Sequence, residues 1–146
     1  EMASRRAARI AEALDHAHKP AVTVDGVEIS IQGNIELARE VPGLLEVGGD
    51  GVGLFRTEYL YLTSSRPPTE VDHLQQYRKA LSDLGGRTLT IRTFDLGADK
   101  AGLAGPDPEP NPMLGLRSIR YCLRNMQMFR TQLRAFFGWQ PKARFG

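Results

Sequence analysis

Residues 51–60 read GVGLFRTEYL, and this stretch decides the fold class that the sequence predicts. Its first five residues form a compact apolar run that is long enough for a buried strand, and Arg56 follows directly. A helix is predicted over residues 69–84, because Thr69 suits an N-cap and the pair Gly85-Gly86 ends the pattern. A second strand is predicted over residues 88–93. Strand, helix and strand in this order favour parallel βα units.

Further elements are predicted on both sides of this unit. The turn Asp25-Gly26 between two extended runs predicts a hairpin over residues 21–31, whose second run continues toward Ile35. The helix over residues 69–84 carries an apolar stripe made of Val71, Leu74, Tyr77 and Leu81. Other helices are predicted over residues 2–17, 42–47, 116–123 and 126–137, and a loop rich in glycine and proline over residues 97–112.

Size and composition fit part of one globular fold. The chain has 146 residues, of which 41% are hydrophobic and 25% are charged, so disorder is not expected. A whole TIM barrel needs about 250 residues, so this chain can form only part of one. The net charge of +2 gives no general attraction to nucleic acid, and no nucleic-acid partner is predicted.

Cysteine content and hydropathy indicate the cellular compartment that the sequence predicts. Cys122 is the single cysteine, which excludes an internal disulfide, and its apolar helical context predicts a buried thiol. No apolar run approaches the ~18 residues that span a membrane, and the N-terminus has no signal-peptide pattern. The sequence therefore predicts a cytoplasmic chain with no membrane contact.

Two arginines stand where parallel strands are predicted to end. Arg56 follows the first strand and Arg92 lies near the end of the second, about one βαβ repeat later. The carboxyl ends of parallel strands meet at one face of a barrel, so the two guanidinium groups are expected to converge. Guanidinium matches phosphate and carboxylate in shape, which predicts an anion site. Arg117 opens the next helix as a third candidate, and Lys100 is a weaker one in a glycine-containing loop.

Simpler interpretations remain open for the same residues. Each arginine can pair with a nearby acid, for which Glu58, Asp95 and Asp99 are available, and Lys100 can be an exposed loop residue. The histidines at positions 16, 18 and 73 are interpreted as structural or solvent-facing, because none stands with a second ligand at metal-binding spacing. No metal site is therefore predicted within the chain.

Several motifs in the same order resemble the phosphoenolpyruvate-utilising enzymes, and within them the Enzyme I family of the bacterial sugar phosphotransferase system. Residues 51–60 resemble the family's Gly-x-Gly-Leu-aromatic-Arg-Thr-Glu signature, and residues 91–100, IRTFDLGADK, its Arg-Thr-x-Asp-x-Gly-x-Asp-Lys segment. Residues 111–117, NPMLGLR, and 130–135, RTQLRA, are similar to the two segments that follow. The resemblance extends from about Pro20 to Ala135.

The resemblance implies a substrate, a reaction and partners. It implies that Arg56 and Arg92 hold the phosphate of phosphoenolpyruvate, with Arg117 and Lys100 nearby. It also implies that a histidine of a separate upstream domain takes the phosphoryl group and passes it to the carrier protein HPr for sugar uptake. Mg²⁺ assists in the family, with ligands expected beyond this chain, and the full-length protein is expected to be a homodimer. No catalytic residue is expected within these 146 residues, which alone should be inactive.

The resulting fold prediction is α/β, a partial (β/α)8 TIM-type barrel with an N-terminal helix leading in from a missing upstream domain. Residues 1–19 are predicted to be that linker helix, residues 20–135 the first part of the phosphoenolpyruvate-binding βα barrel, and residues 136–146 an atypical tail. The tail does not resemble the family's next strand, so a truncated or frameshifted product is expected. The alternatives are a partner chain that supplies the missing strands, a non-catalytic regulatory or dimerisation module, and a fragment of another enzyme such as phosphoenolpyruvate synthase.

Overall fold

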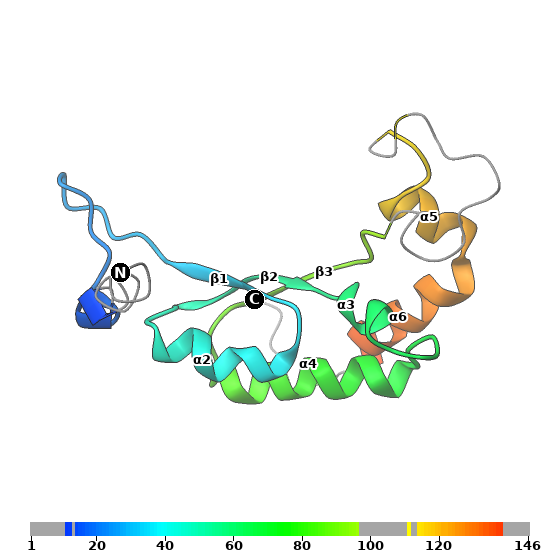
Figure 1. Cartoon of the computed structure of the whole chain (residues 1–146), viewed down its shortest axis with the longest axis horizontal. Coiled ribbons are helices and arrows are strands. Elements are labelled where there is room, and N and C mark those ends of the chain that lie inside the picture. Colours follow the sequence, from blue (N-terminus) through cyan, green and yellow to red (C-terminus); the bar gives the residue numbers. More distant parts are fainter. Residues whose placement is uncertain (1–10, 13, 97–110, 112–113, 139–146) are drawn as a thin grey trace, which may run out of the picture.

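The computed structural model describes residues 11, 12, 14–96, 111 and 114–138, and it is built around a parallel sheet (Figure 1). The sheet contains β1 (Gln32–Ile35), β2 (Gly51–Arg56) and β3 (Leu89–Arg92), in the order β1-β2-β3. Both neighbouring pairs are parallel. The predicted α/β class is therefore confirmed for the described part of the chain.

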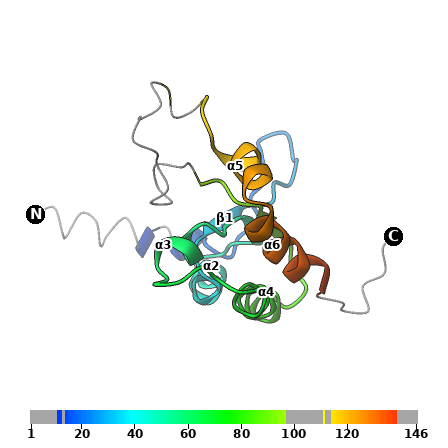
Figure 2. The same ribbon diagram turned by 90° about the vertical axis from the view of Figure 1, so that its right-hand side faces the viewer.

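Helices occupy the crossovers between these strands. The 3-10 helix η1 (Ala38–Glu40) and helix α2 (Val41–Glu46) connect β1 to β2, and α3 (Tyr59–Leu62) and α4 (Glu70–Leu84) connect β2 to β3. After β3 come α5 (Ser118–Arg124) and α6 (Met126–Gly138). Figures 1 and 2 show α2 and α4 side by side along one face of the sheet, with α6 next to α4.

Helix α4 begins and ends at the predicted signals. Thr69 caps its first turn through a reciprocal capping box with Asp72, and Gly85 closes it in the left-handed conformation with φ 58°. The predicted apolar stripe is wrong at Val71, which is 60% exposed. Tyr77 of the predicted stripe is buried and Leu74 packs against the core, and His73, Ala80 and Leu84 are buried as well. The sheet and α6 decide which face of α4 is covered, and hydropathy along the helix does not contain that information.

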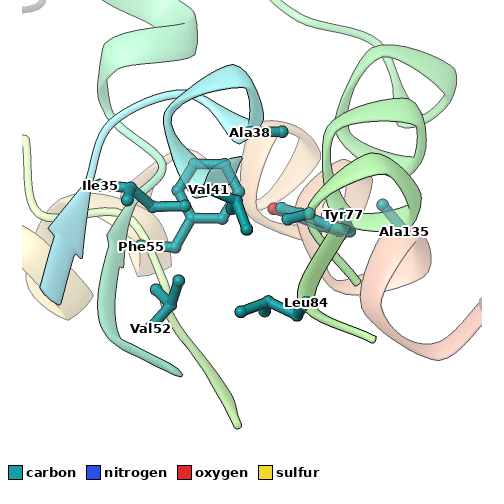
Figure 3. Packing of buried hydrophobic residues seen from close by; sticks show 9 residues of the cluster. Ile35, Ala38, Val41, Val52, Phe55, Tyr77, Leu84 and Ala135 are labelled. Carbon is teal, nitrogen blue, oxygen red and sulfur yellow. The ribbon is translucent and has the colours of Figure 1, made fainter. Parts of the chain in front are cut away.

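The main core lies between the sheet and its helices. Figure 3 shows Phe55 and Ile35 pointing from the strands toward Val41 of α2 and Tyr77 of α4, with Ala135 of α6 beyond. The rings of Phe55 and Tyr77 meet edge to face with centroids 6.0 Å apart. Full burial of a large apolar side chain contributes about 1.5–3 kcal/mol, so this layer holds α4 and α6 on the sheet.

A second, smaller core lies beyond the end of β3. Phe94, Leu96 and Cys122 form it, with Tyr61 and two residues of α6 packed around them. Cys122 is fully buried, as predicted, and burial raises the pKa of its thiol to about 11. This cluster attaches α5 to the segment that follows β3.

The segment before the sheet forms the predicted turn but not the predicted strands. Gly26 has φ 86°, and one antiparallel bridge joins Val22 to Glu28. Two backbone hydrogen bonds flank that bridge, from Thr23 N–H to the Val27 carbonyl and from Ile29 N–H to the Ala21 carbonyl, but the runs form no continuous strand and β1 begins only at Gln32. A two-stranded ribbon is marginal without a layer to cover it, and alternate apolar residues such as Ile29 are exposed here.

Some predictions fall outside the described residues or at their margin. The first turns of the helix predicted over residues 2–17, most of the loop over residues 97–112 and the tail from residue 139 onward are not described. Helix α6 continues to Gly138, so the first three residues assigned to the tail are helical. In the described part, no helix is both long enough and apolar enough to cross a membrane.

Candidate functional site

The carboxyl ends of the three strands bring charged side chains to one edge of the sheet. Arg56 ends β2 and Arg92 ends β3, and the two are register partners across the parallel pair. Glu36 follows β1 directly. Side chains alternate along a strand, and Phe55 and Ile91 pack into the core, so the arginines that follow them lie on the opposite face.

The arginines open onto one shared hollow of about 370 Å³. Its lining combines three acids and two arginines with an apolar floor, and consists of Glu36, Leu54, Arg56, Glu58, Tyr59, Leu62, Arg92, Asp95 and Leu96. All three strand ends contribute, as expected for a site at the carboxyl edge of parallel strands. Convergence of the first two predicted arginines is therefore a geometric fact of this fold.

Arg92 is held firmly by two carboxylates. Its Nη2 lies 2.6 Å from Oε1 of Glu58, and its Nη1 lies 3.2 Å from Oδ2 of Asp95. Glu58 Oε1 also accepts the backbone N–H of Asp95 at 3.0 Å, and the Glu58 side chain is only 8% exposed. Two buried atoms here, Glu58 Oε2 and Arg92 Nε, have no hydrogen-bond partner among the described residues. The Arg92 guanidinium thus has a fixed position. Because a guanidinium has five N–H donors and the Arg92 side chain is 35% exposed, donors of its two Nη atoms remain for a ligand.

Arg56 is held loosely by comparison. Its single described ion pair, to Oε1 of Glu36, is 3.5 Å long, and its side chain is 45% exposed. Exposed pairs of this kind contribute about 0–1 kcal/mol. Arg56 can therefore turn toward an anion in the hollow at little cost.

Asp95 links the hollow to the third predicted arginine. Arg117, at the N-cap of α5, donates from Nη2 to Oδ1 of Asp95 at 3.0 Å, and the Ser118 hydroxyl donates to the same oxygen. Partial burial raises the pKa of the Asp95 carboxyl, but the hydrogen bonds from Ser118 and Arg117 outweigh it and lower the pKa below its usual value. Arg117 does not line the hollow itself, and it reaches the site through Asp95.

The arginines therefore form the ion pairs with nearby acids that the simpler interpretation expected, and Arg56 and Arg92 also converge on one hollow. Three described guanidinium groups face three carboxylates, those of Glu36, Glu58 and Asp95. An arginine that pairs with a carboxylate still has hydrogen-bond donors to offer, because a guanidinium has five N–H donors in a planar fork. The arrangement can bind an anion through donors that the carboxylates leave over. Lys100 and Asp99 lie outside the described residues.

The three histidines lie away from this hollow. His16 and His18 are exposed, whereas His73 is fully buried in α4. Burial lowers the pKa of His73 to about 4, so it is neutral at physiological pH. These surroundings agree with the interpretation of the three residues as structural or solvent-facing.

Sequence reasoning missed three polar residues around the site. Glu36 was not considered as a partner of Arg56, because the contact depends on the pairing of β1 with β2. Thr57 and Gln132 are fully buried and hydrogen-bonded to each other beneath the strand ends. A polar residue within the apolar face of a helix, as at Gln132, is the signal that could have identified one of them.

The described residues do not supply a magnesium site. Nowhere in the described ranges do three or more His, Cys, Asp or Glu side chains gather so that they could hold a metal ion. The carboxylates of the hollow are instead engaged by guanidinium groups. The Mg²⁺ implied by the resemblance therefore does not fit these residues.

Comparison with known sequences matches the chain to one family. Residues 10–143 match the family described as "PEP-utilising enzyme, PEP-binding domain". Proteins named phosphoenolpyruvate-protein phosphotransferase are similar, with 44% identity over 116 residues in Staphylococcus aureus and 42% over 134 residues in Geobacillus stearothermophilus. These alignments cover 78% and 90% of this chain. A multiphosphoryl transfer protein of Rhodobacter capsulatus is 44% identical over 93% of the chain.

The relatives are much longer than this sequence. The chain spans 20% of the Staphylococcus protein, 23% of the Geobacillus protein and 16% of the Rhodobacter protein. The similarity therefore concerns one segment of each relative, and the hollow at the strand ends lies within that segment.

Proposed function

Since the chain belongs to the PEP-utilising enzymes through their PEP-binding domain, we propose that it binds phosphoenolpyruvate in the hollow between Arg56 and Arg92. The whole protein is then a phosphotransferase that passes the phosphoryl group through a phosphohistidine to the carrier protein HPr. Relatives at 42–44% identity carry the name phosphoenolpyruvate-protein phosphotransferase, which supports the proposal.

One observation carries the proposal, namely the register of Arg56 against Arg92. Neighbouring strands lie about 4.8 Å apart, so two side chains at paired positions on one face can contact a single phosphate. Guanidinium forks bind phosphate through short, charge-assisted hydrogen bonds. Two cations at adjacent strand ends repel each other, and an anion between them relieves that repulsion.

The two arginines have different roles in this proposal. Arg92 is braced by Glu58 and Asp95, so it offers a donor set that needs little reorganisation. Arg56 has one long contact to Glu36 and is free to close over the bound phosphate. Arg117, held through Asp95, and Lys100 would add positive charge at the margin of the site.

The chemistry then follows from charge stabilisation. In phosphoryl transfer, negative charge spreads over the equatorial oxygens of the transferring group, and catalysis consists mainly of positioning and electrostatic stabilisation. Arg56 and Arg92 would supply both at the phosphate. Magnesium, when bound by residues other than those described, would contribute further charge neutralisation, and none of the steps above depends on it.

The proposal extends to the architecture. Each strand is followed by a helix that packs into the same core, and α2, α4 and α6 all contribute to it. Helices on one face only are typical of a (β/α)8 barrel, whereas doubly wound sheets carry helices on both faces. We therefore interpret residues 20–138, to the end of α6, as the first part of such a barrel, residues 1–19 as a linker helix and the residues after 138 as a tail. The full-length protein would be a cytoplasmic homodimer.

Titration calorimetry with phosphoenolpyruvate tests the binding step. The complete polypeptide that contains this chain should bind phosphoenolpyruvate, and Arg56→Ala and Arg92→Ala should each weaken binding at least tenfold. Pyruvate, which lacks the phosphate, should bind equally weakly to all three proteins. Equal phosphoenolpyruvate affinity in the wild type and in both variants would refute the proposed site.

A further inference from the structure

Buried polar side chains gather beneath the hollow. In the described part of the chain, the fully buried polar residues are Thr57, His73 and Gln132, and Glu58 is nearly so. Burying an amide such as that of Gln132 is costly unless its donors and acceptor are all satisfied. The hydrogen bonds of Gln132 therefore show what its burial stabilises.

The Gln132 amide, on α6, bonds to both neighbouring strand ends. Its Oε1 accepts the backbone N–H of Phe94 at 3.1 Å, and its Nε2 donates to the Thr57 hydroxyl at 2.8 Å. The Thr57 hydroxyl in turn donates to the backbone carbonyl of Arg92 at 2.9 Å. Gln132 and Thr57 together thus hold the backbone on both sides of Thr93.

These bonds fix the geometry that the anion site needs. Thr57 directly follows Arg56 at the end of β2, and Phe94 lies two residues beyond Arg92 at the end of β3. The ladder between β2 and β3 ends at the Arg56–Arg92 pair, so no further strand pairing holds the two backbones together beyond it. The side-chain bridge through Gln132 continues the connection past that point.

A second branch of the network fixes the orientation of the amide. Gln132 Nε2 also lies 3.5 Å from the Tyr77 hydroxyl, which lies 3.2 Å from Nδ1 of His73. His73 is neutral, so Nδ1 can accept from Tyr77 while Nε2 donates to the Tyr61 hydroxyl at 3.4 Å. Every group then has one consistent direction of donation. Figure 3 shows Tyr77 between the sheet residues and Ala135 of α6.

We propose that Gln132 is a positioning residue for the anion site, which holds the ends of β2 and β3 in the register that sets Arg56 beside Arg92. It touches no substrate in this arrangement and acts through Thr57 and the backbone around Arg92. The identity of the anion rests on the proposed function, whereas the bracing of the two strand ends does not.

Three substitutions separate positioning from general stabilisation. Gln132→Met keeps the volume and removes all the hydrogen bonds of the amide. Thr57→Val removes the link to the Arg92 carbonyl and the bond from Gln132 Nε2, while the bond from Phe94 N–H to Gln132 Oε1 can remain. Leu84→Ala is the matched destabilising control, because Leu84 is fully buried at the other end of α4, where the chain leads into the start of β3. Gln127→Met is the surface control on α6, because Gln127 is exposed.

The experiment uses the complete polypeptide and two measurements, hydrogen exchange of a peptide that contains residues 92–96 and the affinity for phosphoenolpyruvate. Gln132→Met and Thr57→Val should speed exchange in that peptide at least tenfold and weaken phosphoenolpyruvate binding about tenfold. Leu84→Ala should lower the melting temperature without changing either measurement at 25 °C, and Gln127→Met should change nothing.

The outcomes distinguish the inference from the proposed function. If exchange and affinity in folded Gln132→Met match the wild type, or if Leu84→Ala loses as much affinity as Gln132→Met, the inference is wrong. If the wild type binds no phosphoenolpyruvate while exchange at residues 92–96 still rises in Gln132→Met, the proposed function is wrong. The inference that Gln132 holds the ends of β2 and β3 together is then still supported. If Gln132→Met does not fold, Thr57→Val decides the question by the same two measurements.

Discussion

Arg56 and Arg92 lie directly opposite each other at the carboxyl ends of the parallel strands β2 and β3. The two side chains line one hollow, yet they are held differently, because Arg92 bonds to two carboxylates and Arg56 makes one long contact. A fixed cation beside an adaptable one is an arrangement suited to capturing a phosphate from solution.

Replacing Arg92 by lysine keeps the positive charge but should still greatly reduce the activity. Lysine cannot reproduce the planar fork that bonds to Glu58 and Asp95 and still offers a donor to the ligand. We expect Arg92→Lys to lower phosphoryl transfer from phosphoenolpyruvate by about two orders of magnitude, since each charge-assisted contact contributes about 1.5–3 kcal/mol. Steady-state transfer to the carrier protein in the complete polypeptide measures it.

Arg130→Lys is the matched control, because Arg130 is exposed on α6. It should keep nearly full activity. Equal losses in the two variants, or a nearly normal Arg92→Lys protein, would mean that the phosphate site lies on other residues.

Removing the charge of Glu36 should strengthen anion binding. Glu36 competes for Arg56 at the rim of the hollow, and the exposed pair contributes at most about 1 kcal/mol to stability. Glu36→Gln should therefore raise the affinity for phosphoenolpyruvate about two- to fivefold, within the range of that pair energy. Titrations at low and high salt measure it, and the gain should shrink at high salt. A weaker affinity in Glu36→Gln would show that Glu36 supports the site instead.

Buried His73 should make stability depend on pH between about 6.5 and 4. Burial lowers the folded-state pKa to about 4, whereas an unfolded histidine titrates near 6.5. The unfolded chain therefore binds the proton first as the pH falls, and the free energy of unfolding should drop by about 3 kcal/mol across this window. The lowered pKa of the Asp95 carboxyl removes stability only at lower pH, below about 4.

Denaturant unfolding from pH 8 to pH 4 measures this effect. His73→Gln should flatten the dependence, because glutamine does not titrate. His16→Gln should leave it unchanged, since His16 is exposed on another segment. The same slope in wild type and His73→Gln would show that other groups cause the loss.

The N-terminal cap of α4 should make a measurable contribution to the free energy of unfolding. The Thr69 side chain accepts the N–H of Asp72, and the Asp72 carboxylate accepts the N–H of Thr69. Thr69→Ala should lower the free energy of unfolding by about 1 kcal/mol, whereas Thr69→Ser should keep most of it. Chemical denaturation of the two variants measures the difference, and equal losses in both would show that the hydroxyl bond is not what stabilises the turn.

Local signals accounted for most of the secondary structure and for the positions of two arginines. The strand before Arg56 is a short apolar run, and α4 is bounded by a threonine cap and a glycine pair, so neither depends on distant residues. The burial of Cys122 also followed from its apolar neighbours. Prediction was wrong at Val71, because the buried face of a helix depends on what packs against it, and here a buried His73 replaced the expected apolar residue.

The sequence by itself determined the order of strands and helices and the placement of Arg56 and Arg92 at strand ends, because backbone preferences and side-chain periodicity are set by neighbours within a few residues. Only the tertiary structure decided which groups hold those arginines and their backbones. Glu58 reaches the backbone of Asp95 across 37 residues, and Gln132 reaches Thr57 across 75. A hydrogen bond needs its two atoms within about 3 Å. For residues so far apart in sequence, only the pairing of β2 with β3 and the packing of α6 on the sheet bring those atoms together.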